Sequence, residues 1–134
     1  MKTLIFALLA LTAQAQAHEG HSHEPALEAA PHGGILRDAP PYKTELTLQG
    51  ADAKIYLYDK TLKPVPAARL KPEAKGRLGL PKDKTKREVV FKLTGDRYEA
   101  KLPGIEKVHR FDLHVNMTVD GKDILGDFGV DNIR

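Results

Sequence analysis

A cluster of histidines near the start of the chain is the first feature able to do chemistry. Four of the six histidines fall within a short span, at His18, His21, His23 and His32. Neutral imidazole is the commonest protein ligand for transition metals, and glutamates are interleaved with the first three histidines. The pattern predicts a metal-binding tail, because short histidine-rich tracts are typical of metal sites. The alternative is a solvated polar linker that is rich in histidine.

The other residue types narrow the choice of metal. The chain has no cysteine, and Met117 is the only methionine beyond the start. A site built from imidazole and carboxylate suits Zn, Cu(II), Ni or Co better than Cu(I), which prefers sulfur ligands. We therefore expect a divalent transition metal ion as the cofactor, without a preference among these four.

The stretch before the histidines predicts a secretory signal peptide over residues 1–17. Lys2 precedes an apolar run at 4–11, and small residues at 13–17 offer cleavage after Ala15 or Ala17. The apolar run is shorter than the ~20 residues that span a bilayer. We expect an exported, soluble, periplasmic protein without membrane insertion.

The cleavage position affects the metal chemistry. A cut after Ala17, which we slightly prefer, leaves His18 at the new N-terminus, where its amine and imidazole can chelate one ion together. A cut after Ala15 leaves this histidine third from a free amine, which favours square-planar Cu(II) or Ni(II). The sequence allows both cuts.

Three strand pairs follow the tail. Alternating apolar residues predict hairpins over 42–48 with 53–59, over 88–94 with 97–102, and over 111–119 with 124–130. The last two have strong turn signals, Gly95-Asp96 and Asp120-Gly121. Counting outward from the turns places Leu46 opposite Ile55, Leu93 opposite Tyr98, and Met117 opposite Ile124. Residues 77–80 are a candidate for a further short strand. No long helix is indicated, so we expect a single antiparallel β-sandwich over residues 35–134, with a small barrel as the alternative. Residues 18–34 are expected to be a flexible tail, hinged at Gly33-Gly34.

Within this scaffold, the third hairpin places His114 opposite Asp127 on its outer face. A carboxylate beside an imidazole can be a second ligand or can fix the ring's tautomer. The alternative, which we favour for His114 alone, is a weak surface pair. A tail folded over the sheet would bring His21, His23 or His32 to His114. His109, at the start of its strand, is expected at the rim of the core.

Other function classes lack their signatures. No Gly-x-Ser-x-Gly turn, phosphate-binding glycine loop or His-Glu-x-x-His helix occurs, so we expect no enzyme. The formal net charge is +3, with one local basic run over 82–87. We interpret this run as a solvated loop and expect no nucleic-acid partner.

Several short motifs also carry a resemblance. They are His32-Gly33-Gly34, the segments 42–46 and 55–59, the Lys63-Pro64-Val65-Pro66-Ala67 stretch, and a last strand with Asp127-Phe128. Together they resemble the small His-Gly-Gly β domain found alone or attached to periplasmic adaptor subunits of heavy-metal efflux pumps of the resistance-nodulation-division type. The resemblance implies a metal-binding or metal-handing accessory role, an efflux-pump adaptor as partner, and His32 as a functional residue. A weaker resemblance is to periplasmic copper-resistance β-sandwich proteins.

Two functions are therefore open. The first is a periplasmic transition-metal buffer or carrier, accessory to heavy-metal efflux or resistance. The second is a non-enzymatic interaction module of the cell envelope, in which the histidine-rich tail is only a linker.

Overall fold

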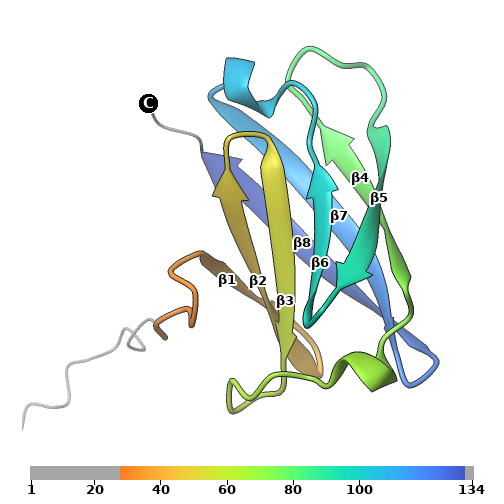
Figure 1. The fold of residues 1–134 in the computed structure, drawn as a ribbon. Helices are drawn as coiled ribbons and strands as arrows, with labels where there is room; N and C mark the ends of the chain where they lie inside the picture. The colour runs from red at the N-terminus through yellow and green to blue at the C-terminus, as the bar shows by residue number, and fades with distance from the viewer. Residues whose placement is uncertain (1–27, 132–134) are drawn as a thin grey trace, which may run out of the picture.

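Eight antiparallel strands form one sheet in the part of the chain that the structure describes (Figure 1). The computed structural model describes residues 28–131. The strands are β1 (Ile35–Ala39), β2 (Tyr42–Gln49), β3 (Asp52–Tyr58), β4 (Glu73–Gly79), β5 (Arg87–Thr94), β6 (Arg97–Lys101), β7 (Arg110–Val119) and β8 (Lys122–Asp131). Two short 3-10 turns, η2 (Ala67–Arg69) and η3 (Ile105–Lys107), lie in connections between them. Within the described part of the chain, no helix is long and apolar enough to cross a membrane.

The strands follow the order β1-β2-β3-β6-β5-β4-β7-β8 in one continuous sheet. The sheet curls until β1 approaches β8, so it is nearly closed. The all-β, antiparallel prediction is confirmed. Of the two architectures left open by the sequence, the continuous sheet has the connectivity of a small barrel, while its two walls enclose a packed core as in a sandwich.

The three predicted hairpins form in the expected registers. Leu46 pairs with Ile55, Leu93 with Tyr98, and Met117 with Ile124. Gly95 has a φ of +66°, as its turn requires. At the β7–β8 turn, both Asp120 (φ 51°) and Gly121 (φ 81°) adopt the left-handed conformation of a type I′ turn.

Strand β4 is longer than its sequence pattern indicated. The expected segment was 77–80, whereas β4 begins at Glu73 and pairs with both β5 and β7. Its inward positions include Ala74 and Gly76, and such small residues give a weak hydrophobic signal. Position 76 requires glycine, because a Cβ atom there would lie 2.8 Å from the Phe91 ring.

Alternation within each strand separates the core from the outer surface. Leu78, Leu113 and Phe128 are completely buried and belong to one continuous apolar cluster inside the sheet. Residues of the opposite phase, such as Lys75 and His114, face outward. A charged residue of the outward phase is therefore expected to be solvated, and Glu45 is the exception.

Candidate functional site

Glu45 is a buried carboxylate on the outer side of β2. Leu46, the next residue, faces the core, so Glu45 points away from it. Its side chain nevertheless has 0% exposure, because the segment before β1 lies across it. A buried charge is costly unless it is hydrogen-bonded, so the partners of Glu45 determine what this site is.

Four donor groups surround the Glu45 carboxylate. The backbone N–H of His32 donates to Oε1 at 3.2 Å and to Oε2 at 3.0 Å. The backbone N–H of Gly34 donates to Oε2 at 2.8 Å. The Tyr58 hydroxyl donates to Oε1 at 2.7 Å, and the His32 Nδ1 atom lies 3.1 Å from the same oxygen. These distances fit charge-assisted hydrogen bonds to an ionised carboxylate.

The protonation states follow from this network. Burial raises the pKa of Glu45, but hydrogen bonds from Tyr58, Gly34 and His32 outweigh it, so the pKa lies below its ordinary value. Burial, and then the hydrogen bond to Glu45, raise the pKa of Tyr58. Glu45 is therefore anionic at neutral pH, and Tyr58 keeps its proton and donates it.

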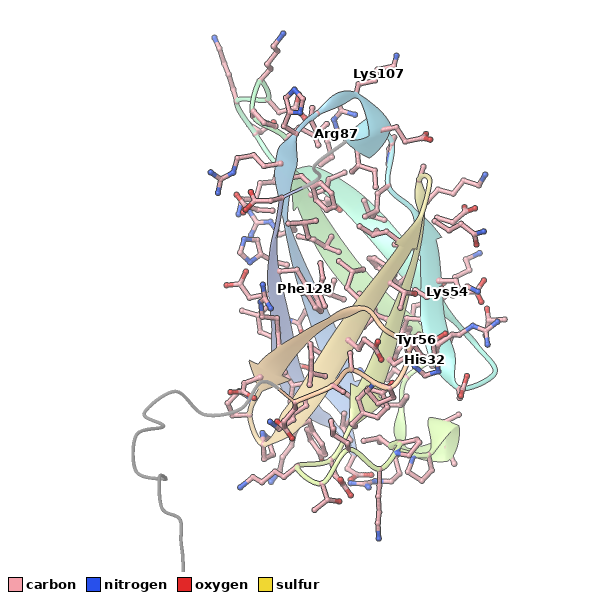
Figure 2. The ribbon with its side chains drawn as sticks, turned by 90° about the vertical axis from the view of Figure 1, so that its left-hand side faces the viewer. His32, Lys54, Tyr56, Arg87, Lys107 and Phe128 are labelled. Atoms are coloured by element: carbon pink, nitrogen blue, oxygen red, sulfur yellow. The ribbon has the colours of Figure 1, made fainter. Side chains whose placement is uncertain are left out.

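The His32 imidazole is held in one orientation. Its ring stacks on Tyr56, with centroids 3.7 Å apart and an interplanar angle of 12° (Figure 2). Its Nδ1 atom lies 2.8 Å from the Tyr58 hydroxyl oxygen. Because that hydroxyl donates to Glu45, its oxygen accepts a hydrogen bond, which requires a proton on Nδ1 of His32.

The second nitrogen of His32, Nε2, is not engaged by residues 28–131. In the neutral ring with Nδ1 protonated, Nε2 carries the lone pair. Among residues 28–131, no hydrogen bond involves Nε2, and the side chain is 42% exposed. The structure thus presents a partly exposed imidazole on a ring held by Glu45, Tyr56 and Tyr58. We call these four residues the His32 clamp.

The two glycines after His32 explain how the chain reaches Glu45. Gly33 has a φ of +72° and completes a turn in which its N–H donates to the Ala30 carbonyl at 3.0 Å. At Gly34, a Cβ atom would lie 2.3 Å from the Leu46 carbonyl oxygen. Only glycine allows the backbone to approach β2 closely enough for the Gly34 N–H to bind Glu45.

The expected boundary between tail and domain therefore needs correction. Residues 32–34 were expected to be part of a flexible tail with a glycine hinge, but they are packed and hydrogen-bonded onto β2 and β3. The sequence pattern suggested flexibility because glycine pairs are typical of loops, whereas here they permit close packing. His18, His21 and His23 and the predicted signal peptide lie outside the described residues.

The second candidate pair also forms. His114 and Asp127 are directly opposed on β7 and β8, and Nδ1 lies 3.0 Å from Oδ1. However, the hollow beside His114 is also lined by Lys75, Arg77 and Lys86. These cations oppose a bound dication, which supports the surface-pair interpretation of His114. His109 is exposed, directly before β7.

The structure does not bring His32 and His114 together. The His32 clamp rests on β2 and β3, whereas His114 lies on β7, and β8 and β1 stand between β7 and β2 across the nearly closed edge of the sheet. In the described part of the chain, no hydrogen bond, ion pair or ring contact joins His32 to His114. Within residues 28–131, no group of three or more histidine, aspartate or glutamate side chains is arranged around one point for a metal ion. The described residues supply one oriented imidazole rather than a complete coordination sphere.

Sequence reasoning identified His32 but missed Glu45, Tyr56 and Tyr58. A signal was present in the register that it predicted correctly, because pairing Leu46 with Ile55 places Glu45 opposite Tyr56. A glutamate facing a tyrosine on the outer side, with a second tyrosine two residues on, marks a covered surface. Its cover was not apparent because residues 28–34 have no strand or helix pattern.

Comparisons with known proteins supply no further constraint on the site. No protein-family model, curated protein or solved structure matches this chain.

Proposed function

We propose that this protein binds a divalent transition metal ion, Zn, Cu(II), Ni or Co, through Nε2 of His32. In this proposal it is a non-enzymatic periplasmic buffer or carrier, accessory to heavy-metal efflux or resistance. The observation that carries the proposal is the clamped imidazole, whose Nδ1 is engaged by Glu45 and Tyr58 while its other nitrogen makes no hydrogen bond to residues 28–131 and the side chain is 42% exposed.

The arrangement supports metal binding because it has the form of a carboxylate–histidine–metal triad. Histidines that bind metals usually donate their other ring N–H to a carboxylate or carbonyl, which fixes the tautomer and increases the ligand's basicity. Glu45 is anionic and buried, so it performs both tasks for His32. An ordinary surface histidine would need no buried carboxylate behind it.

The other ligands in this proposal come from the histidine-rich segment before residue 28. Zinc sites are usually four-coordinate, and one imidazole alone binds weakly. His18, His21 and His23 have the right chemistry and lie a short length of chain from His32. The His114–Asp127 pair is the less favoured location, because of its cationic neighbours.

Isothermal titration calorimetry of the signal-free protein with each of the four ions tests the proposal. We expect one of the four ions to bind. His32→Ala should weaken that binding by at least about 10- to 100-fold, because this is the usual loss when even a group that supports a metal ligand is removed. His109→Ala is the matched control, because His109 is exposed and lies outside the clamp. Equal affinities for the wild type and His32→Ala would refute the role of His32.

Deleting residues 18–27 separates this function from an interaction module. This deletion leaves the packed residues 28–34 in place, so it removes the histidines without disturbing Glu45. Under the metal-binding proposal, affinity falls by at least the factor seen for His32→Ala. Unchanged metal affinity would show that the segment is only a linker.

A further inference from the structure

Three shallow hollows lie in a row along the seam between β4 and β7. The first, beside Lys71 and Thr118, has a volume of about 350 Å³, and the second, beside Arg77 and His114, about 340 Å³. Both are lined by Lys75 and Asn116. The second and the third, about 290 Å³, are both lined by Lys86. Because neighbouring hollows share lining side chains, we treat the three together as one surface, which we call the β4–β7 trough.

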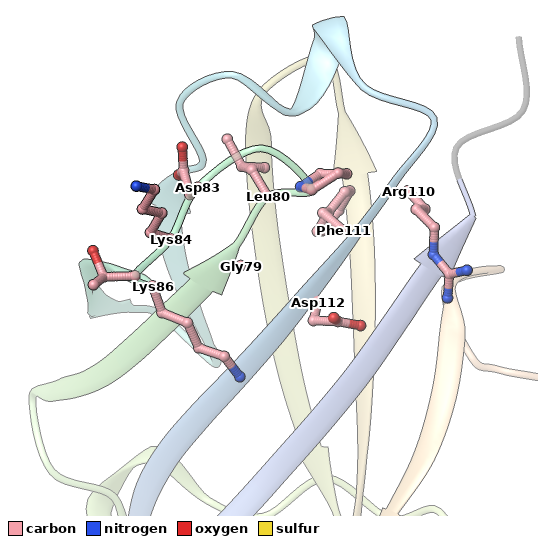
Figure 3. Close-up of a pocket in the computed structure, with 10 residues that line it drawn as sticks. Gly79, Leu80, Asp83, Lys84, Lys86, Arg110, Phe111 and Asp112 are labelled. Carbon is pink, nitrogen blue, oxygen red and sulfur yellow. The ribbon is translucent and has the colours of Figure 1, made fainter.

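Cationic side chains outnumber acidic ones among the residues that line this trough. Figure 3 shows its third hollow, with Lys84, Lys86 and Arg110 around the end of β4 and the start of β7. The cationic side chains along the whole trough are Lys71, Lys75, Arg77, Lys84, Lys86 and Arg110. The acidic ones are Glu73, Asp83, Asp112 and Asp123.

Most of these cations are not neutralised within the protein. Among residues 28–131, five of these six cations make no salt bridge. The sixth, Arg110, has its Nε atom 3.9 Å from Asp131 Oδ1. By contrast, Asp83 is already paired with Arg87 at 2.7 Å. The trough therefore presents unpaired positive charge along its floor.

Apolar side chains flank the middle of the trough. Val90 and Leu125 are the exposed large hydrophobic residues of the described chain, at 49% and 54% exposure. They lie in one row across the sheet, because Val90 pairs with Lys75, Lys75 with Asn116, and Asn116 with Leu125. Exposed apolar side chains on both sides of a line of cations indicate a surface that contacts another molecule.

We propose that the β4–β7 trough binds an extended acidic segment of a partner protein, in which an acidic residue stands at every second position. Residues two apart on a strand are separated by roughly 6.8 Å, so Lys75 and Arg77 match acidic side chains two apart on an extended chain. From Thr118 to Asp112 the trough is about 20 Å long at the rise of a β-strand, which accommodates about six extended residues. The acidic side chains of such a segment share one face, so the aliphatic stems of the side chains that meet Lys75 and Arg77 would lie against Val90 and Leu125.

The charge distribution favours a peptide over a nucleic acid. Glu88 and Asp127 lie at the two ends of the row that contains Arg77 and His114. These carboxylates would repel a phosphate backbone, which carries charge continuously. A peptide can place apolar or neutral residues opposite them. This surface does not overlap the His32 clamp, so the inference is independent of metal binding.

Fluorescence anisotropy with a labelled eight-residue peptide of alternating glutamate and valine tests the proposal, using the signal-free protein in a chelator. We expect saturable binding that weakens at higher salt, because the charges are exposed. The double variant Lys75→Glu with Arg77→Glu should weaken binding by about tenfold or more, because two attractive charge contacts become repulsive. Leu125→Ser should weaken it by about threefold, through lost apolar contact.

Controls distinguish the alternatives. Lys60→Glu with Lys107→Glu makes the same charge change at exposed sites outside the trough and should leave binding within about twofold. Circular dichroism of each variant verifies that the sheet is intact. Absence of saturable binding, equal binding of a lysine–valine peptide, or equal loss in the control variant overturns the proposal. Tighter binding of an eight-nucleotide single-stranded DNA would identify a nucleic-acid surface instead.

Discussion

At the scale of single residues, the site depends on Glu45, a buried anion whose partners are mostly backbone N–H groups and Tyr58. Replacing this carboxylate by the neutral amide in Glu45→Gln weakens every one of these hydrogen bonds and introduces an NH₂ group facing donors. We expect a loss of about 1–3 kcal/mol in the free energy of unfolding, measured with urea in a chelator. Glu88→Gln, at an exposed position, is the control. A loss in Glu45→Gln no larger than in this control would contradict the assignment.

The low pKa of Glu45 gives this stabilisation a definite pH dependence. Its folded pKa lies below the ordinary value of 4.5, so the folded state binds the proton less well than the unfolded state. The stabilisation is therefore complete above about pH 4.5 and is lost as the pH falls through the lower, folded value. Urea unfolding in a chelator should show the difference between wild type and Glu45→Gln narrowing in this acidic range. A constant difference down to about pH 2 would be incompatible with an ionised Glu45.

Metal binding should respond to pH in a higher range. Histidine ligands must lose their proton to bind a metal, and histidine side chains as a class titrate near pH ~6.5. Affinity should then fall about tenfold per histidine ligand between about pH 7.5 and about pH 5.5. Titrations at both pH values, with His21→Ala and His23→Ala beside the wild type, count the ligands. An affinity that is constant down to about pH 5 would point to carboxylate ligands instead.

At the scale of elements, the turn over 32–34 positions the clamp, and it depends on close backbone contact. In Gly34→Ala the new Cβ would lie 2.3 Å from the Leu46 carbonyl and 2.8 Å from Thr47 Cγ2. We expect a loss of about 1–3 kcal/mol in unfolding free energy, with weaker metal binding, because the turn must move off β2.

Gly129→Ala is the control for this substitution. Gly129 lies in β8, and a Cβ there would contact only Asp112 Oδ1, at 3.6 Å. Urea unfolding should find this variant close to wild type. If Gly34→Ala were equally stable and bound metal equally well, the turn would not be what holds His32.

Most of the sheet could be predicted from its hairpins, because apolar alternation and turn glycines are local signals. The registers of β2 with β3 and of β7 with β8 follow from counting outward from their turns. The pairing of β3 with β6 and of β4 with β7 could not be predicted, since it depends on packing between distant residues. The clamp was missed for the same reason. His32 and Glu45 meet only when an irregular segment folds across β2.

At the scale of the whole molecule, metal binding should be linked to stability. A ligand that binds only the folded state at 100 times its dissociation constant stabilises a protein by about 2.7 kcal/mol. For a domain of about 100 residues, that raises the melting temperature by roughly 10–20 °C. Calorimetric scans with the preferred ion, and again after adding chelator, should show a reversible shift. His32→Ala should show a much smaller one, and an equal shift would place the ion elsewhere.

The order of the strands has a consequence for how the chain is made. Every residue of the His32 clamp occurs between 32 and 58, early in synthesis, whereas the wall opposite β2 and β3 includes β7 and β8, which come last. Until β7 leaves the ribosome, β4 has an open edge, and an unpaired edge invites pairing with other chains. A nascent chain that stops before residue 110 therefore carries all the groups of the clamp but lacks Leu113 and Phe128, which fill the core behind it.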